Sequence, residues 1–194
     1  MSFADAYRWW QRIGDKTRSV GISRSFASWG RNSLIQFPLR LSGEERIAIG
    51  SGVFIGAGSW LQVIDPASAS APAIVVGDGT RVSGGCVLSA VASIEIGDNV
   101  LIARNVYIAD HSHAYLDPDL PIRLQGLTNI APVTIGDGAW LGQNVVVNPG
   151  VRIGRNAVVG ANSVVTTSIP DYSLAVGAPA RVVRTWASPP GRPD

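Results

Sequence analysis

The chain has 194 residues, 46% of them hydrophobic and 15% charged, a balance that excludes an intrinsically disordered protein and is enough for one domain with a buried core. The formal net charge of +2 gives no broad positive field, so no nucleic acid partner is expected. The single cysteine excludes an internal disulfide, and no apolar run approaches the about 18 residues of a membrane-spanning helix. Because the first residues also lack the apolar segment of a signal peptide, we expect a cytoplasmic location.

Residues 1–45 are expected to form an amino-terminal segment that begins with a short helix in SFADAYRWWQRIGDKTRS, residues 2–19. Trp9, Trp10 and Ile13 fall near one side of this helix. Basic residues surround them: Arg8, Arg12, Lys16 and Arg18. The interpretation that we favour is a cap over the open end of the repeats that follow, where unpaired backbone needs cover. The alternative is a basic, tryptophan-bearing surface that makes peripheral contact with a membrane.

Aliphatic side chains recur every sixth residue through most of the chain from 46 to 184. The clearest series lies in IGDGAWLGQNVVVNPGVRIGRNAVVGANSVV: Ile135, Leu141, Val147, Ile153, Val159 and Val165. Three earlier series keep the same step: Ile49, Ile55, Leu61; Val76, Val82, Leu88, Ile94; and Ile96, Ile102, Ile108. The third series begins only two residues after the second ends, so the phase slips by two residues there. A period of six fits neither an α-helix nor simple strand alternation. It fits short strands joined by tight turns that close triangular coils, with Gly and Asn at left-handed turn positions.

This pattern resembles the hexapeptide-repeat proteins, whose fold is a left-handed parallel β-helix. The resemblance covers residues 46–184 and implies an all-β domain of stacked coils of about eighteen residues each. It also implies a homotrimer. A sandwich of short strands is the alternative, but a sandwich does not keep a strict period of six. Cys86 falls at an inward position among small residues, so we expect a buried thiol and not a nucleophile.

Two segments interrupt the repeat, and the tail 185–194 is expected to be flexible. PASASAPA, residues 66–73, is small and rich in proline, so it predicts an exposed loop. The second interruption, DHSHAYLDPDLPIRLQGLTNIAP, begins at Asp110 and predicts an extruded loop over 111–132. A long loop on a rigid scaffold is a typical place for a functional site.

His111 and His113 are the only histidines of the chain and begin this loop, next to Asp110. A neutral imidazole is a suitable proton acceptor near neutral pH, so a catalytic role is predicted for at least one of them. Zinc needs three or four protein ligands, and no metal is expected because each site would need a carboxylate to complete it. A non-catalytic or metal-binding hexapeptide protein of the γ-carbonic-anhydrase type, which gathers three histidines across subunits, stays open as an alternative.

Both DHSHAYLDPDLP and the carboxyl-terminal stretch that ends in GAPARVVR resemble the sugar O-acetyltransferases of the hexapeptide group, which include galactoside, maltose, nodulation and colanic-acid acetyltransferases. The resemblance implies transfer of acetyl from acetyl-CoA to a sugar hydroxyl, in cell-surface polysaccharide or glycan-precursor biosynthesis. A histidine base would allow the hydroxyl to attack the thioester directly. The resemblance favours His113 as this base, with His111 orienting it or touching the sugar. The alternative reaction is N-acetylation of an amino sugar.

The resemblance also implies further site residues, in sites that lie between neighbouring subunits with the loop of one reaching across. Expected acceptor contacts are Ser83, Asp110, Asp117, Arg123 and Trp140. Expected contacts to the coenzyme A arm and phosphates are Gly142, Gln143, Ala161, Thr166, Thr167, Arg181 and Arg184. The backbone N–H of Gly142 is a candidate to stabilise the oxyanion. In the loop, Asp117, Asp119 and Arg123 either bind sugar hydroxyls or cap the loop's own turns, and both interpretations stay open.

Overall fold

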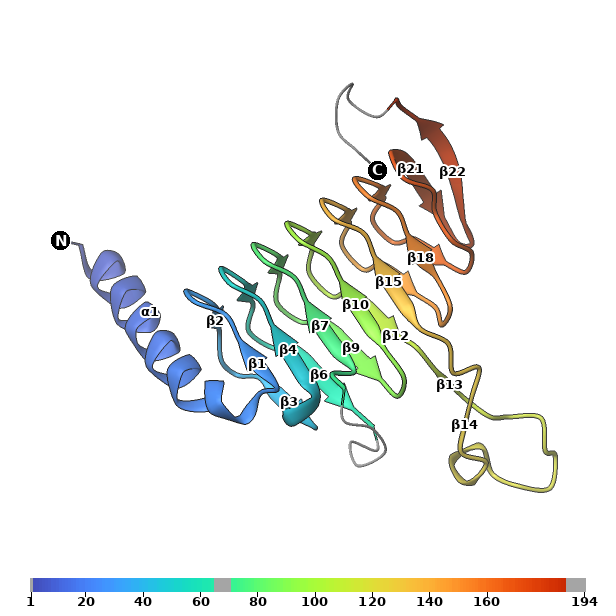
Figure 1. The fold of residues 1–194 in the computed structure, drawn as a ribbon, viewed down its shortest axis with the longest axis horizontal. Coiled ribbons are helices and arrows are strands. Elements are labelled where there is room, and N and C mark those ends of the chain that lie inside the picture. Colours follow the sequence, from blue (N-terminus) through green and yellow to red (C-terminus); the bar gives the residue numbers. More distant parts are fainter. Residues whose placement is uncertain (1, 65–70, 188–194) are drawn as a thin grey trace.

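A computed structural model describes residues 2–64 and 71–187 of the chain as a stack of triangular coils that form a parallel β-helix, preceded by one long helix (Figure 1). Each coil gives one strand to each of three sheets, which we name face A, face B and face C in the order in which the chain visits them. Within the three faces the strands are parallel, apart from an antiparallel hairpin that ends face B. The chain therefore winds as a prism whose three walls are the three faces.

Within residues 2–64 and 71–187, the three faces contain six, eight and six strands. Face A consists of β1 (Ser28–Trp29), β4 (Ile47–Ile49), β7 (Ile74–Val76), β10 (Ile94–Ile96), β15 (Val133–Ile135) and β18 (Arg152–Ile153). Face B consists of β2 (Leu34–Ile35), β5 (Phe54–Ile55), β8 (Arg81–Val82), β11 (Leu101–Ile102), β16 (Trp140–Leu141), β19 (Val158–Val159), β21 (Ser173–Gly177) and β22 (Ala180–Thr185). Face C consists of β3 (Arg40–Ser42), β6 (Trp60–Val63), β9 (Val87–Ala90), β12 (Tyr107–Ala109), β17 (Val146–Val147) and β20 (Val164–Val165).

The six-residue series of aliphatic side chains forms the interior of the prism, as predicted. Register pairs Ile96 with Ile135 and Ile135 with Ile153, so that each aliphatic residue stacks on its equivalent in the next coil. These three residues are at most 2% exposed. Each fully buried aliphatic side chain contributes about 1.5–3 kcal/mol relative to leaving it in water. The predicted period therefore corresponds to three columns of stacked apolar residues, one behind each face.

The predicted boundary at residue 46 is wrong, because the first coil of the prism already begins at Ser28. Strands β1, β2 and β3 stack in register on β4, β5 and β6. Trp29, Ile35 and Leu41 keep the step of six in this coil, but the first of them is aromatic. A short 3₁₀ helix, η2 (Glu44–Arg46), then adds two residues before the series resumes at Ile49. The aromatic residue and the slip conceal this coil in the sequence.

The long helix α1 (Phe3–Ile22) covers the open end of the first coil, as the favoured interpretation predicts. Ser19 Oγ accepts a hydrogen bond from the N–H of Ile35 (2.9 Å), and Asp15 Oδ1 accepts one from the N–H of Phe37 (3.4 Å). These contacts satisfy backbone groups that have no further strand to pair with. A 3₁₀ turn, η1 (Ser23–Ser25), then leads from α1 into β1.

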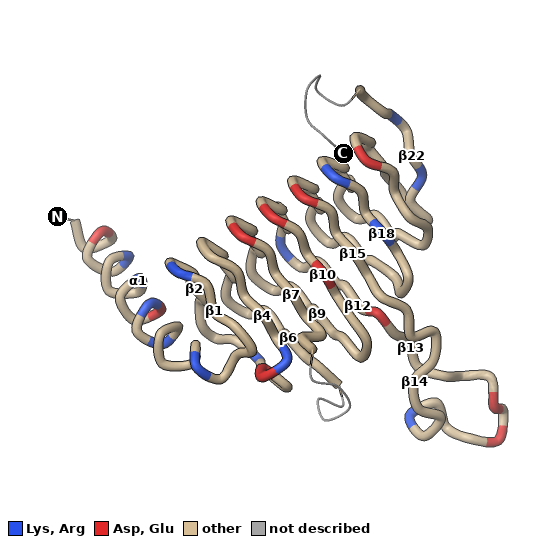
Figure 2. Tube along the Cα trace, in the orientation of Figure 1, with Lys and Arg blue, Asp and Glu red and all other residues tan. Residues whose placement is uncertain are grey.

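Aspartates in the turns between face A and face B tie successive coils together. The N–H of Ser51 donates to Asp78 Oδ1 (2.7 Å), that of Asp78 to Asp98 Oδ1 (2.7 Å), and that of Asp98 to Asp137 Oδ1 (2.8 Å). Figure 2 shows acidic residues in successive turns along one edge of the prism. The GDG and GDN motifs of the repeat thus supply side-chain acceptors that continue the backbone ladder around the corner.

Replacement of Gly56 by alanine is expected to destabilise the prism by about 3 kcal/mol, because overpacking against backbone is not easily relaxed. A Cβ at this position would lie 2.4 Å from Gly84 N and 2.9 Å from Ser83 C, both in the backbone of the next coil. Thermal unfolding followed by circular dichroism measures the effect. Gly21→Ala is the control, since a Cβ there meets nothing within 4 Å and alanine favours the helix. Equal melting temperatures for the two variants would contradict this packing.

Cys86 is buried, as predicted for a structural thiol. Its Sγ lies 3.0 Å from the carbonyl oxygen of Ser83 and 3.1 Å from that of Ala103. Burial raises the pKa of this thiol above its usual value, which disfavours the reactive thiolate. The side chain therefore fills the corner between faces B and C as a small packing residue.

The predicted loop after Asp110 projects from the prism (Figure 1). It contains a small hairpin, β13 (Ser112–His113) and β14 (Leu127–Thr128), and a 3₁₀ turn, η4 (Ile122–Leu124). The N–H of Ala131 donates to the carbonyl oxygen of Asp110 (2.8 Å), which closes the neck of the loop. Of the other predicted interruptions, residues 65–70 and the tail from 188 lie outside the described residues. Ala71 and Pro72 are exposed, but Ala73, the last residue of the predicted exposed loop, is buried.

Candidate active site

Asp110 and His111 form a buried pair at the edge where face C ends. Asp110 follows β12 directly, and its side chain is 0% exposed. Its carboxylate accepts hydrogen bonds from three successive N–H groups in the preceding coil: Val91 (2.9 and 3.0 Å), Ala92 (2.7 Å) and Ser93 (2.8 Å). His111 Nδ1 lies 2.9 Å from Asp110 Oδ1, and its side chain is only 8% exposed. The imidazole is therefore held on a rigid wall of the prism, although the loop begins here.

The partners of Asp110 determine the proton arrangement of His111. An ionised carboxylate, the ordinary form of aspartate near neutral pH, only accepts hydrogen bonds, and Asp110 already accepts them from three backbone N–H groups. His111 Nδ1 must then carry the hydrogen that it shares with Asp110, which leaves a lone pair on Nε2. The pair has the arrangement of a general base and the carboxylate that orients it.

This position of Asp110 differs from the acceptor contact that the sequence predicts. A carboxylate with no exposed surface, three N–H donors and an imidazole partner has no face to offer a sugar hydroxyl. In the structure Asp110 holds the imidazole of His111, and the three N–H groups that anchor its carboxylate are a part of this arrangement that sequence reasoning missed. Backbone N–H groups leave no signal in the residue types. The one signal in the sequence is the slip of two residues between Leu88 and Ile96, which marks the longer turn that contains residues 91–93.

His113 has a different environment from His111. It lies on β13, pairs with Leu127 across the hairpin of the loop, and is exposed. The two side chains are therefore not equivalent candidates. One is anchored by a buried carboxylate on the prism, and the other stands on the projecting loop.

The loop residues Asp117 and Arg123 lie away from the wall that holds His111. Asp117 Oδ1 accepts a hydrogen bond from the N–H of Asp119 (2.9 Å), so Asp117 caps a turn of the loop itself. The side chain of Gln125 braces the same turn through the N–H and carbonyl oxygen of Asp117 (3.1 and 2.9 Å). Arg123 is exposed in η4. The capping interpretation holds for Asp117, and the sugar-binding roles of Asp117 and Arg123 stay predictions.

The other predicted residues fall on two different sides of the prism. Thr166 and Thr167 follow β20 on the edge that carries His111, two coils and about 10 Å further along the stack. The remaining residues lie on face B or at its corner with face C: Ser83, Trp140, Gly142, Gln143, Ala161, Arg181 and Arg184. In a triangular prism the corner between faces C and A is opposite face B. A single chain therefore does not bring His111 together with Trp140.

Gly142 has a structural role that excludes it as an oxyanion donor. Its N–H donates to the carbonyl oxygen of Val159 (2.8 Å), so it is already engaged in the ladder between coils. A Cβ at this position would lie 2.6 Å from Ala161 N, which explains why glycine is needed at this corner. Trp140 and Leu101, by contrast, pair across face B with side chains 49% and 45% exposed.

No group of three or more His, Cys, Asp and Glu within residues 2–64 and 71–187 is arranged to hold a metal ion.

Comparison with known proteins identifies the family. The model of the bacterial transferase hexapeptide family (six repeats) matches residues 132–167. The putative lipopolysaccharide biosynthesis O-acetyl transferase WbbJ of Escherichia coli is 33% identical over 176 residues, which cover 87% of this chain and 86% of the relative. The hexapeptide-repeat acetyltransferase VCA0836 of Vibrio cholerae, solved with acetyl coenzyme A, is 30% identical with a TM-score of 0.60, and the match covers 90% of this chain and 79% of that chain.

The match to one further relative is shorter. The probable acetyltransferase Rv3034c of Mycobacterium tuberculosis is 49% identical over 98 residues, half of this chain, and the chain spans only 32% of that relative. The fold is that of a β-helical transferase. The full-length similarity to WbbJ and VCA0836 shows that the chain belongs to the hexapeptide-repeat acetyltransferase family, and its fold is the left-handed parallel β-helix that the sequence predicts.

Proposed function

We propose that this protein transfers an acetyl group from acetyl-CoA to a hydroxyl of a sugar, in the biosynthesis of a cell-surface polysaccharide or glycan precursor. The observation that carries the proposal is the buried Asp110–His111 pair, in which Asp110 orients the imidazole and leaves Nε2 to accept a proton. His111 is the general base in this proposal. The expectation that His113 is the base stays a prediction, which the histidine variants test.

The reaction follows from this geometry. His111 Nε2 removes the proton of the acceptor hydroxyl as its oxygen attacks the thioester carbonyl, and Asp110 stabilises the imidazolium that forms. Collapse of the tetrahedral intermediate breaks the carbon–sulfur bond and forms the acetyl ester. The imidazolium returns its proton to the departing thiolate of coenzyme A, so the enzyme ends in its starting state. No covalent acyl-enzyme is needed.

Similarity to two relatives supports the choice of donor and acceptor. VCA0836, at 30% identity, was solved with acetyl coenzyme A, and WbbJ, at 33% identity, is described as a putative O-acetyl transferase of lipopolysaccharide biosynthesis. Arginines at positions 181 and 184, both exposed on β22, suit the phosphates of the coenzyme. A donor that is available in the cytoplasm fits the expected cytoplasmic location.

The proposal includes a homotrimer in which each site is shared by two chains. His111 lies at the corner opposite face B, whereas Trp140 lies on face B with half of its surface exposed. If face B of one chain approaches the His111 edge of its neighbour, the two sets of predicted residues meet in one cleft. Closed cyclic symmetry repeats this contact three times.

Release of free thiol from acetyl-CoA, measured with a panel of sugars, amino sugars and glycan fragments, tests the proposed function. We expect thiol release that depends on a sugar hydroxyl, with the acetyl ester identified by mass spectrometry. Transfer only to the amine of an amino sugar would favour the N-acetylation alternative. Absence of transfer to sugars, glycan fragments and lipid-linked saccharides alike would contradict the proposal.

A further inference from the structure

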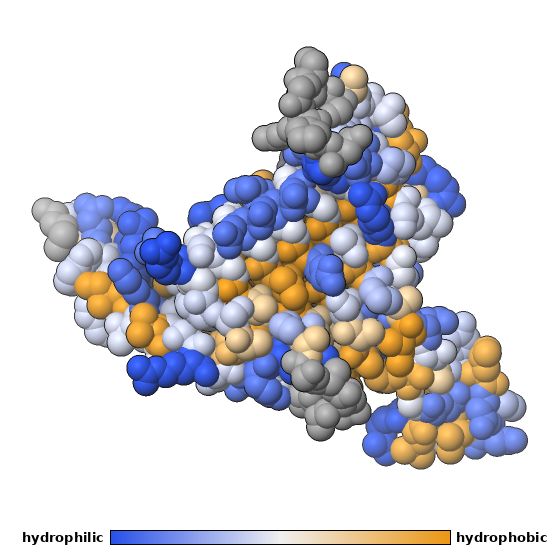
Figure 3. Space-filling view, in the orientation of Figure 1, coloured by the Kyte–Doolittle hydropathy of each residue, from blue (hydrophilic) through white to orange (hydrophobic). Residues whose placement is uncertain are grey.

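Helix α1 presents an apolar face to solvent. Phe3, Trp10, Ile13 and Val20 follow the three- and four-residue steps of one helical face and are 89%, 72%, 45% and 65% exposed. Trp9, next to this face, is 58% exposed. Figure 3 shows hydrophobic residues on the outer surface of α1, at the left of the view. We name Phe3, Trp9, Trp10, Ile13 and Val20 the α1 stripe.

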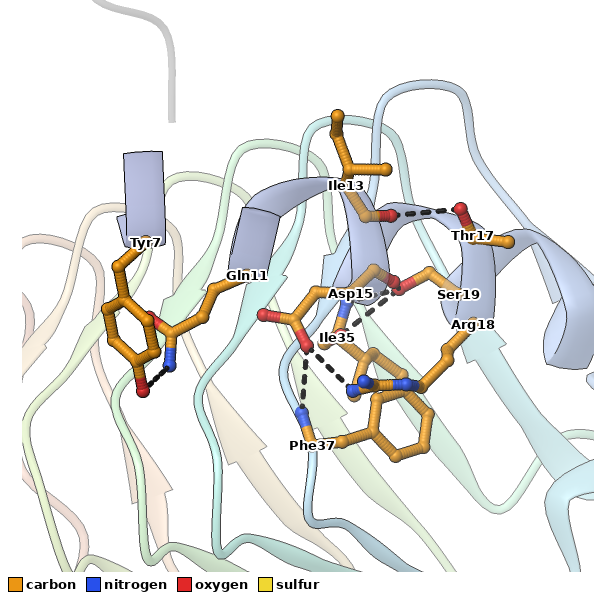
Figure 4. Close-up of polar contacts among 9 residues, drawn as sticks. All are labelled: Tyr7, Gln11, Ile13, Asp15, Thr17, Arg18, Ser19, Ile35 and Phe37. Carbon is orange, nitrogen blue, oxygen red and sulfur yellow. Dashed lines mark hydrogen bonds and ion pairs between the residues drawn. The ribbon is translucent and has the colours of Figure 1, made fainter. Parts of the chain in front are cut away.

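The opposite side of α1, which faces the prism, is polar. Figure 4 shows Asp15 and Ser19 pointing toward Ile35 and Phe37, with Ile13 on the other side of the helix. Asp15 and Ser19 are 7% and 1% exposed and are the buried residues of α1. A surface helix of a globular protein normally buries its apolar side and exposes its polar side. In α1 this arrangement is inverted, so the α1 stripe is not used by the fold of one chain.

Basic side chains border the α1 stripe. Lys16 lies at one edge of the stripe beside Trp9, with Arg12 next to it. Arg18 is instead turned toward the prism, where it pairs with Asp15 and lies over the ring of Phe37 (Figure 4). Arg12 and Lys16 form no ion pair within the described part of the chain, and they line a hollow of about 620 Å³ between α1 and face B. Residues 2–34 contain six basic and two acidic residues, although the whole chain has a net charge of only +2. The stripe is therefore an apolar surface with a positive border.

We propose that the α1 stripe docks on the surface of a lipid bilayer that contains anionic lipids, with α1 lying in the plane of the interface. Tryptophan and aliphatic side chains would enter the boundary between headgroups and acyl chains, while Lys16 and Arg12 extend to lipid phosphates. No helix of the described residues is long and apolar enough to span a bilayer. Pairing of the stripe with the same stripe of a second copy would bring like charges together, which disfavours that occupant.

Sedimentation with vesicles tests the docking of the full-length chain. Vesicles of phosphatidylglycerol and phosphatidylcholine in equal parts are expected to bind the protein about tenfold more strongly than vesicles of phosphatidylcholine alone, and added salt is expected to weaken the binding. Trp10→Glu is expected to lower binding to the anionic vesicles by about tenfold or more. Because Trp10 is 72% exposed, its replacement should leave the helical circular dichroism and the melting temperature unchanged.

Leu116→Glu is the matched control, because Leu116 is 85% exposed on the projecting loop and the substitution adds the same charge away from α1. This variant is expected to bind the anionic vesicles as the unmodified protein does. Failure of the unmodified protein to bind anionic vesicles, or equal loss in both variants, would overturn the proposal. A smaller assembly of the Trp10→Glu protein in light scattering, together with absence of vesicle binding by the unmodified protein, would assign the stripe to a contact between subunits.

Discussion

The His111→Ala protein is expected to lose acetyl transfer by about 10²–10⁴-fold, the usual contribution of a positioned general base. His111 is the residue whose imidazole is both anchored and oriented, since its Nδ1 lies 2.9 Å from the buried carboxylate of Asp110. The substitution removes the proton acceptor but leaves the three N–H donors of the preceding coil bound to Asp110. The change is measured as kcat for thiol release at saturating acetyl-CoA, with coenzyme A affinity measured separately by calorimetry.

His113→Ala is the matched control, with the same change in an exposed position on the loop. Turnover is expected to stay within about tenfold of the unmodified protein, since this histidine is not held by a carboxylate. Both variants should keep their coenzyme A affinity and their melting temperature. The opposite result, a large loss with His113→Ala and a small one with His111→Ala, would show that the favoured sequence prediction was right and that His111 is structural.

Most of the prism could be predicted because its six-residue period can be recognised within a short stretch of sequence. An inward position every six residues is visible in any short stretch of the repeats after residue 46 outside the two interruptions, and the buried columns follow from it. The first coil was missed because Trp29 occupies an aliphatic position, and because η2 shifts the series before Ile49. Such a shift is absorbed at a corner of the prism, where extra residues bulge outward without disturbing the stack.

The site could be predicted only in part, because its geometry depends on residues in different coils. The pattern DHSH identified Asp110 and His111 as candidates, but the anchoring of Asp110 comes from backbone N–H groups at 91–93, which carry no side-chain signal. The choice between His111 and His113 depends on the buried, anchored carboxylate of Asp110, which contacts His111. The amphipathic pattern of α1 was visible in the sequence, but the side that meets the prism was not. Asp15 and Ser19 face inward because they satisfy the exposed backbone of the first coil.

Mixed trimers of His111→Ala and Trp140→Asp chains are expected to recover about one third of the turnover of the unmodified protein, although each variant alone is nearly inactive. Trp140 lies on face B, opposite the edge that carries His111, so each proposed site takes its histidine from one chain and its tryptophan from the next. In any mixed trimer, one of the three contacts joins an intact His111 edge to an intact face B. Co-expression with two different affinity tags and purification through both gives the mixed assemblies for the assay.

Mixed assemblies of His111→Ala and His111→Asn chains are the control, because none of their three contacts contains an intact base. They are expected to stay inactive, which separates restoration of a shared site from stabilisation by mixing. Recovery in the first mixture alone would assign the two residues to one site built by two chains. If the first mixture also stays inactive while light scattering gives the mass of a trimer, face B does not meet the His111 edge. The acetyl-transfer site must then be completed by residues of the chain that carries the base, and Trp140 would not belong to it.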